Sequence, residues 1–173
     1  MRKSSKLVVG IIVILAVIIA VAAYFNRENV ADKKALIENA EFIVYDNGQE
    51  VVRYDMQEIS EMGETTFKAN LKTSGKAPIP YEYTGVLLKN ILAEAGISLE
   101  GKSSVIVSAA DGYVVAVDID KVLDENNVYL AYRREGELIG TKESGGKGPY
   151  QMIISKDQFS QHWCKYAISA EVK

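Results

Sequence analysis

The stretch VIVSAADGYVVAVD, from Val105 to Asp118, decides the fold. Two short runs rich in valine and isoleucine flank a polar turn with a glycine, which is typical of a β-hairpin. Neither run alternates cleanly, which predicts strands buried on both faces. We therefore expect the hairpin at the centre of the protein, with Asp111, Gly112 and Tyr113 at the rim of a sheet. Rim loops often carry binding sites, but the spacing alone favours an Asp-Gly turn that only reverses the chain.

Composition and charge narrow the class of protein. The chain has 173 residues, of which 48% are hydrophobic and 25% charged, as in globular proteins and unlike disordered, collagen-like or coiled-coil chains. Three of the 20 basic residues and none of the 23 acidic ones fall in the first 25 positions, so the remainder is acidic. An acidic domain without a basic, aromatic stripe argues against nucleic acid as a partner. One cysteine and one histidine make neither an internal disulfide nor a metal cage.

The run from Leu7 to Phe25 carries no charge and follows three basic residues. A helix of this length spans about 28 Å, close to the thickness of the hydrocarbon layer. We expect residues 1–25 to form a single-pass membrane anchor, 26–40 a tether, and 41–173 a domain on the extracytoplasmic side of the cell membrane. The alternative is a cleaved signal peptide, because Ala20-Val21-Ala22 offers small residues at a suitable position. Both interpretations export the domain.

The rest of the chain predicts an α+β domain with a mixed sheet. Asn47-Gly48 between two β-rich runs predicts a hairpin over 42–54, and the capping-box spacing of Asp55 and Glu58 predicts a short helix that ends at Gly63. Thr84 is expected to cap a helix over 86–95 that lies on the sheet. Further expected elements are a strand over 65–73, a loop over 74–80, a short helix after Asp118, strands over 128–132, 150–154 and 166–172, a glycine-rich loop over 140–148, and a short helix over 157–163.

Two sequence features could indicate nucleotide binding or nucleophilic catalysis, and neither has the pattern that these functions need. The glycine-rich loop lacks the spacing and the following helix of a nucleotide-binding P-loop. It can still present backbone N–H groups to an anion, with Lys142 or Lys147 nearby, or be a flexible surface loop. His162 is the sole histidine, which leaves little for a catalytic triad, and Cys164 is best interpreted as a small buried hydrophobic residue.

Several motifs occur in one order along the chain. They are Tyr83–Leu88, Ala110–Tyr113, Leu130–Tyr132 with Gly136 and Leu138 after it, Gly146–Ile153, and Trp163–Tyr166. This order resembles the oxidoreductase molybdopterin-binding domain of the sulfite oxidase family, over most of Ile43 to Val172. The resemblance implies an α+β fold around a mixed sheet and a pocket for a pterin and its metal. It also implies that Tyr113 faces the pocket, and that the Gly-Pro segment and Lys165 border the pterin side.

The sequence departs from that family where the metal is bound. Active members bind molybdenum through a cysteine in the segment that matches Thr65–Gly75, which here contains none. The arginines that follow this cysteine are absent too, and Gln151 stands where many members have arginine. Because a pterin phosphate prefers permanently charged, bidentate partners, both anchors are weakened. We therefore expect no resident cofactor and no metal site, with molybdopterin as the alternative.

The resulting hypothesis is a membrane-anchored extracytoplasmic domain that acts as a binding or accessory module. Its partners would be the membrane, through Leu7–Phe25, and a small polar or anionic ligand or a membrane redox partner. The first alternative is a molybdopterin-dependent oxidoreductase with a non-cysteine metal ligand, and the second is a small-anion carrier or sensor that uses the glycine-rich loop. No catalytic residue is assigned. The residues expected to form the binding site are Tyr83, Asp111, Gly112, Tyr113, Gly146, Lys147, Gly148 and Lys165.

Overall fold

The computed structural model describes residues 10–24, 35, 37, 39–72 and 75–173, and it divides the chain into two units between Ala35 and Leu36. In the first unit, residues 10–24 are helical. Among the residues described, no helix is both long and apolar enough to cross a membrane. The anchor expected over Leu7–Phe25 lies partly outside these residues, and most of the expected tether does as well.

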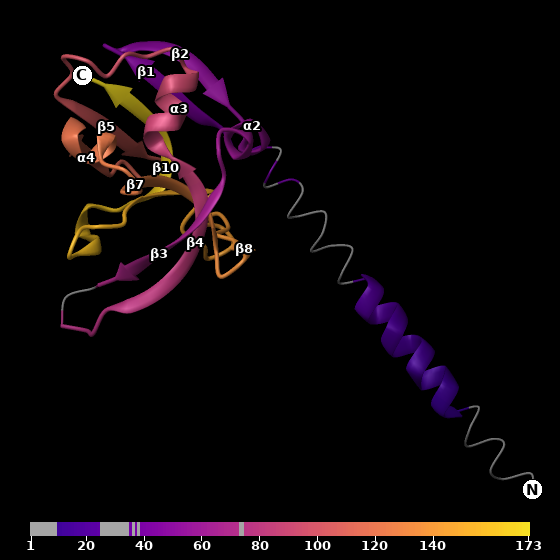
Figure 1. The fold of residues 1–173 in the computed structure, drawn as a ribbon. Coiled ribbons are helices and arrows are strands. Elements are labelled where there is room, and N and C mark those ends of the chain that lie inside the picture. Colours follow the sequence, from indigo (N-terminus) through magenta and orange to yellow (C-terminus); the bar gives the residue numbers. More distant parts are fainter. Residues whose placement is uncertain (1–9, 25–34, 36, 38, 73–74) are drawn as a thin grey trace, which may run out of the picture. The chain divides into compact units, whose positions relative to one another are not determined.

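The second unit is built on one mixed sheet, as predicted, with small helices packed beside it (Figure 1). Strands β2-β1-β10-β9-β7-β4-β3 follow one another across it, while β5 pairs with β10 and β6, and β8 pairs with β7. The β1–β10 pair is parallel and the other pairs are antiparallel. The strands are β1 Phe42–Asp46, β2 Gln49–Tyr54, β3 Thr65–Leu71, β4 Ile79–Leu87, β5 Ser104–Ala109, β6 Val114–Asp118, β7 Val128–Arg134, β8 Glu137–Leu138, β9 Tyr150–Ile154 and β10 Cys164–Val172. The helices of this unit are α2 Met56–Glu61, α3 Leu88–Glu94, α4 Ile119–Leu123 and the 3₁₀ helix η1 Ser160–His162.

The predicted hairpin forms as β5 and β6, but it does not lie at the centre of the sheet. β6 pairs only with β5, and every second residue of both strands is buried, so one face is covered. The fully buried strand is β9, beside β7, whose first five residues are also buried. The prediction of two covered faces was wrong because the apolar residues Ile106, Val114 and Ala116 occupy exposed or partly exposed positions, which hides the alternation in a hydrophobicity pattern.

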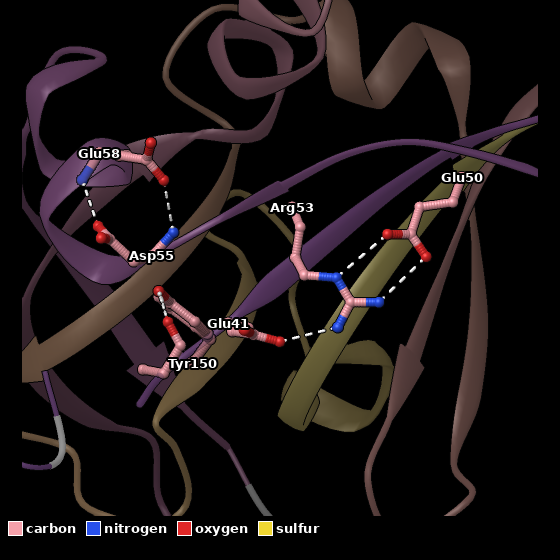
Figure 2. A network of polar contacts seen from close by, with 7 residues as sticks. Glu41, Glu50, Arg53, Asp55, Glu58 and Tyr150 are labelled. Carbon is pink, nitrogen blue, oxygen red and sulfur yellow. Dashed lines mark hydrogen bonds and ion pairs between the residues drawn. The ribbon is translucent and has the colours of Figure 1, made fainter. Parts of the chain in front are cut away.

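The amino-terminal hairpin and its short helix form as predicted. Asn47 and Gly48 both adopt positive φ, as a tight hairpin turn requires. Asp55 and Glu58 form a reciprocal capping box at the start of α2. Figure 2 shows this cap, and beside it Arg53, which donates to Glu41 at 2.8 Å and to both oxygens of Glu50 at 3.1 Å. These local contacts define the hairpin and its cap, and the parallel pairing of β1 with β10 joins the hairpin to the rest of the sheet.

Two predicted boundaries around β4 were wrong for the same physical reason. Thr84 does not cap a helix: β4 continues to Leu87, and α3 begins only at Leu88. Residues 83–87 pair with β7, so sheet hydrogen bonds hold them instead of a helix. β4 also begins at Ile79, so Pro80 belongs to the strand. Proline is tolerated there because this end of β4 pairs only with β3, outside the stretch that pairs with β7.

Two further expectations change at the carboxyl end. The helix expected over 157–163 is reduced to the single 3₁₀ turn η1, and β10 begins at Cys164, two residues before the expected strand. Two register shifts interrupt the pairing of β10, and Tyr166, which lies within the shift relative to β9, has a positive φ of 54°. These irregularities let β10 pair with β9 at its start and with β5 and β1 further along.

Candidate anion-binding site

A cavity of about 590 Å³ opens at the rim of the sheet. It lies where the turn between β5 and β6 meets the end of β3, the starts of β9 and β10, and the η1 segment. Its walls are formed by Leu71, Lys72, Asp111, Tyr113, Gln151, Phe159, Ser160, Gln161, Trp163 and Lys165. Three residues expected from the sequence, Asp111, Tyr113 and Lys165, therefore line one cavity.

The floor of the cavity comes from paired positions on β10 and β9. Lys165 lies opposite Gln151 in the antiparallel ladder, so both side chains are on the same face of the sheet. Gln151 is only 2% exposed and contributes a buried amide, while Lys165 is exposed and contributes a cation. Gln151 and Lys165 thus give the cavity a polar floor, and Lys165 adds one positive charge.

The outer wall of the cavity is the segment around η1, which hydrogen bonds and a cation–π contact hold in place. The Ser160 hydroxyl donates to the Lys72 carbonyl at 2.8 Å and accepts from the Lys72 N–H at 3.2 Å. The Tyr113 hydroxyl donates to the Gln161 carbonyl at 3.1 Å. Lys72 also lies over the Phe159 ring, 4.4 Å from its centroid. The Tyr113 hydroxyl therefore helps to hold this wall in place, while the Tyr113 side chain lines the cavity.

Lys165 lines this cavity, and the carbonyl of Lys147 accepts a hydrogen bond from the N–H of Tyr166, the residue after Lys165. The pKa of Lys147 is lowered, first by the charge of Lys165, then by burial, and last by Arg134. Arg134 lies opposite Tyr83 on the β7–β4 ladder, and its guanidinium is 5.0 Å from the centre of the Tyr81 ring. Among the described residues, no carboxylate forms an ion pair with any of the three cations. Two carboxylates nevertheless lie close in the fold, because Glu137 is opposite Arg134 on the β7–β8 ladder and Asp111 lines the same cavity as Lys165.

Arg134 was not predicted as a site residue, because the pair Arg133-Arg134 was interpreted only as the start of a turn. Tyr83, which was expected to line the cleft, is instead 1% exposed and packs edge-on against Trp163, with 5.9 Å between ring centroids. Burial raises the pKa of Tyr83, while the neighbouring Arg134 lowers it. Tyr83 therefore supports Trp163 from within the core.

The glycine-rich loop places Lys147 and uses its own N–H groups internally. Gly145, Gly146 and Gly148 donate to carbonyls of Lys142, Thr141 and Gly140 at 2.7–3.0 Å. A Cβ at Gly146 would lie 2.2 Å from the Ile139 carbonyl oxygen, so only glycine fits there. The Lys147 carbonyl accepts from Tyr166 N–H at 2.9 Å, which fixes the loop to β10. These three N–H groups are therefore not available to an anion.

The other expected glycines have structural surroundings as well. Gly112 has a φ of +87° in the β5–β6 turn, where its N–H donates to the Ala109 carbonyl. Gly148 lines a second cavity of about 350 Å³, which shares Asp111 with the first. Of the eight expected site residues, Asp111, Tyr113 and Lys165 line the main cavity, Lys147 does not line it, Tyr83 is buried, and Gly112, Gly146 and Gly148 shape the backbone nearby.

The donor set does not fit a thiolate-bound molybdenum. Cys164, the single cysteine, is 0% exposed and pairs with Met152, on the opposite face of β10 from Lys165. Burial, assisted by the charge of Asp111, raises its pKa to about 12, which keeps it a neutral thiol. Within the described part of the chain, no three histidine, cysteine or acidic side chains are grouped to hold a metal. The cations suit a phosphate, but the cavity offers no thiolate.

The mixed sheet and its cationic rim cavity define a domain of the sulfite-oxidase-like class. A family model, "Oxidoreductase molybdopterin binding domain", matches residues 31–166. The chain belongs to this family, and the resemblance inferred from its motifs is confirmed.

A solved structure supports the same fold. The sulfane dehydrogenase SoxCD from Paracoccus pantotrophus superposes with a TM-score of 0.62 and 18% sequence identity, over 78% of this chain. The matched region is 38% of the SoxCD chain, so this chain spans well under half of that protein. At this identity, the likeness shows the fold alone. Comparison with curated proteins gives no match.

Proposed function

We propose that the chain is a membrane-anchored, extracytoplasmic member of this family that binds a small anionic ligand or serves a membrane redox partner. In this proposal it is an accessory module and has lost the molybdenum chemistry of active members. The fold alone cannot assign activity, so the proposal depends on the chemistry of the site.

One observation carries the proposal: two lysines, Lys72 and Lys165, line an aromatic-walled cavity in which Asp111 is the one acidic wall residue. Positive charges that lie close together repel each other, and a bound anion relieves this repulsion. The cavity adds apolar area from Leu71, Phe159 and Trp163, which suits an organic anion better than a bare inorganic one.

The alternative is a molybdopterin-dependent oxidoreductase whose metal has a non-cysteine ligand. Family membership favours it, and so does a cation cluster that could hold a pterin phosphate. Against it stand the missing thiolate and the burial of Cys164.

The binding proposal is tested with Trp163, which is the only tryptophan of the chain and lines the cavity. Full-length protein in mild detergent is titrated with benzenesulfonate while the Trp163 emission is recorded. Benzenesulfonamide, which has the same ring but no charge, is the matched control. We expect saturable quenching or a spectral shift with the sulfonate and weaker binding of the sulfonamide. Equal affinity for both compounds would contradict an anion site.

The topology is tested separately. If Leu7–Phe25 anchors the chain with its basic flank inside, protease added to intact protoplasts should digest the domain that follows. A cytoplasmic protein must stay intact in the same sample, as the control for leakage. Full protection of the domain until detergent is added would show the opposite orientation.

A further inference from the structure

Gln151 brings a buried amide to the cavity, and the described part of the chain does not pair it. The residue is 2% exposed, lines the cavity, and lies on the same face of the sheet as Lys165. Among the described residues, no hydrogen bond involves the Gln151 side chain, whereas every fully shielded polar side-chain atom has a partner. The amide therefore reaches the open space of the cavity. Because an unpaired buried amide costs free energy, a ligand that forms hydrogen bonds is favoured there.

Two opposite charges line the same cavity without forming a direct ion pair. Asp111 and Lys165 are both wall residues, and no ion pair between described residues joins them. The Asp111 carboxylate is held in the β5–β6 turn, where its Oδ1 accepts from the Tyr113 N–H at 3.1 Å. A carboxylate has about four acceptor positions, so Asp111 retains capacity for a cationic group. The cavity thus offers an anion, a cation and an amide to one ligand.

The remaining wall of the cavity is aromatic. Trp163 lines the cavity, and the buried Tyr83 packs edge-on behind it, with 5.9 Å between ring centroids. Phe159 adds a second ring to the wall. The ammonium of Lys72 already lies over this ring, 4.4 Å from its centroid, which is a cation–π contact. Lys165 is therefore the cation that is better placed to hold an anionic group of a ligand.

We propose that the cavity binds a free α-amino acid with an aromatic side chain, as its zwitterion. Lys165 and the Gln151 amide hold the ligand carboxylate, and Asp111 accepts hydrogen bonds from the ligand ammonium. The ligand ring packs against the aromatic wall. The inference rests on the proposed anion binding, because the carboxylate is the anionic group, and it adds a contact of opposite charge. A ligand with an anionic group alone would leave Asp111 unpaired and would be repelled by it.

The test compares three ligands on the full-length protein in mild detergent, through the emission of Trp163. L-Phenylalanine is the proposed kind of ligand, 3-phenylpropanoate has the same skeleton without the ammonium group, and benzenesulfonate probes the anion site alone. We expect phenylalanine to bind at least about tenfold more tightly than 3-phenylpropanoate, because a charge-assisted hydrogen bond to Asp111 adds to the carboxylate contact. Equal affinities would overturn the inference and leave the proposed anion site standing. Failure of all three to bind would reject the proposed function itself.

Asp111→Asn isolates the contact to the ammonium group. Asparagine keeps the turn, because its side-chain oxygen also accepts from a backbone N–H two residues on. In this variant phenylalanine should bind about tenfold more weakly, whereas 3-phenylpropanoate should bind more tightly because a repelling charge is gone. Asp120→Asn, which removes one exposed negative charge from α4, is the matched control and should keep the preference for phenylalanine. A preference that survives Asp111→Asn would overturn the inference.

Gln151→Met tests the contact of the buried amide. Methionine is flexible and apolar, so it fills the buried position while the hydrogen bond to the ligand is lost. We expect phenylalanine and 3-phenylpropanoate to lose about tenfold in affinity each, because both present a carboxylate. Unchanged affinities would contradict the place of Gln151 in the site. A loss for phenylalanine alone would put the amide beside the ammonium and would overturn its assignment to the carboxylate.

Discussion

Leu92→Ala is expected to lower the free energy of unfolding by about 2–5 kcal/mol, the range for emptying a buried leucine site. Leu92 is 0% exposed and lies on α3 with Leu88 and Ile91, which are equally buried. α3 begins later than the sequence predicts, and Leu88, Ile91 and Leu92 form its buried face. The change removes apolar contacts and leaves a cavity that the surrounding sheet cannot fill.

The measurement is urea unfolding followed by the emission of Trp163, which is 4% exposed in the folded domain. Leu123→Ala is the matched control, because Leu123 also lies on a helix but is 49% exposed. We expect the control to stay within about 0.5 kcal/mol of the unmodified protein. Equal losses in the two variants would contradict the packing of α3 described above.

Lys165→Gln is expected to weaken benzenesulfonate binding by about 10- to 100-fold. A hydrogen bond to a charged group contributes about 1.5–3 kcal/mol, and about 1.4 kcal/mol corresponds to tenfold in affinity. Lys165 lines the cavity, so its replacement removes a positive charge from the site itself. Affinity is measured with the same Trp163 titration as above.

The control for this variant is Lys68→Gln, which removes one exposed positive charge from β3. It separates local binding from the effect of net charge, and we expect a change of less than about twofold, because exposed charges are screened by salt. Similar losses in both variants would mean that the sulfonate responds to overall charge, and the assignment of the cavity would fail.

Local sequence signals predicted the parts of the fold that local contacts hold. Asn47-Gly48 indicated its hairpin because the turn itself needs positive φ, and Asp55 with Glu58 indicated α2 because both halves of the cap are within four residues. The start of α3 was missed because β7, more than 40 residues later, keeps the residues before Leu88 in a strand. No window around Thr84 contains that information.

The candidate site was also predicted only in part, and the residues that distant strands place there were not predicted. Asp111, Tyr113 and Lys165 were found from the order of family motifs, and the cavity unites them. Arg134 reaches the cluster only through the register that sets it opposite Tyr83, and a register between distant strands cannot be read from spacing. The burial of Tyr83 was not predicted for a related reason. The rings that pack against it belong to Trp163 and Phe67, which lie in other segments of the chain.

The central claim is that this family member has lost its molybdenum site, and the most direct test is the metal content of the full-length chain. The chain is produced in a host with a complete molybdopterin pathway, purified in mild detergent and analysed for molybdenum per chain, with Cys164→Ser in parallel. We expect far less than one molybdenum per chain in both proteins, and unchanged benzenesulfonate binding in Cys164→Ser. One molybdenum per chain would contradict the claim: its loss in Cys164→Ser would make the buried thiol a ligand, and its persistence would establish the oxidoreductase with a non-cysteine ligand.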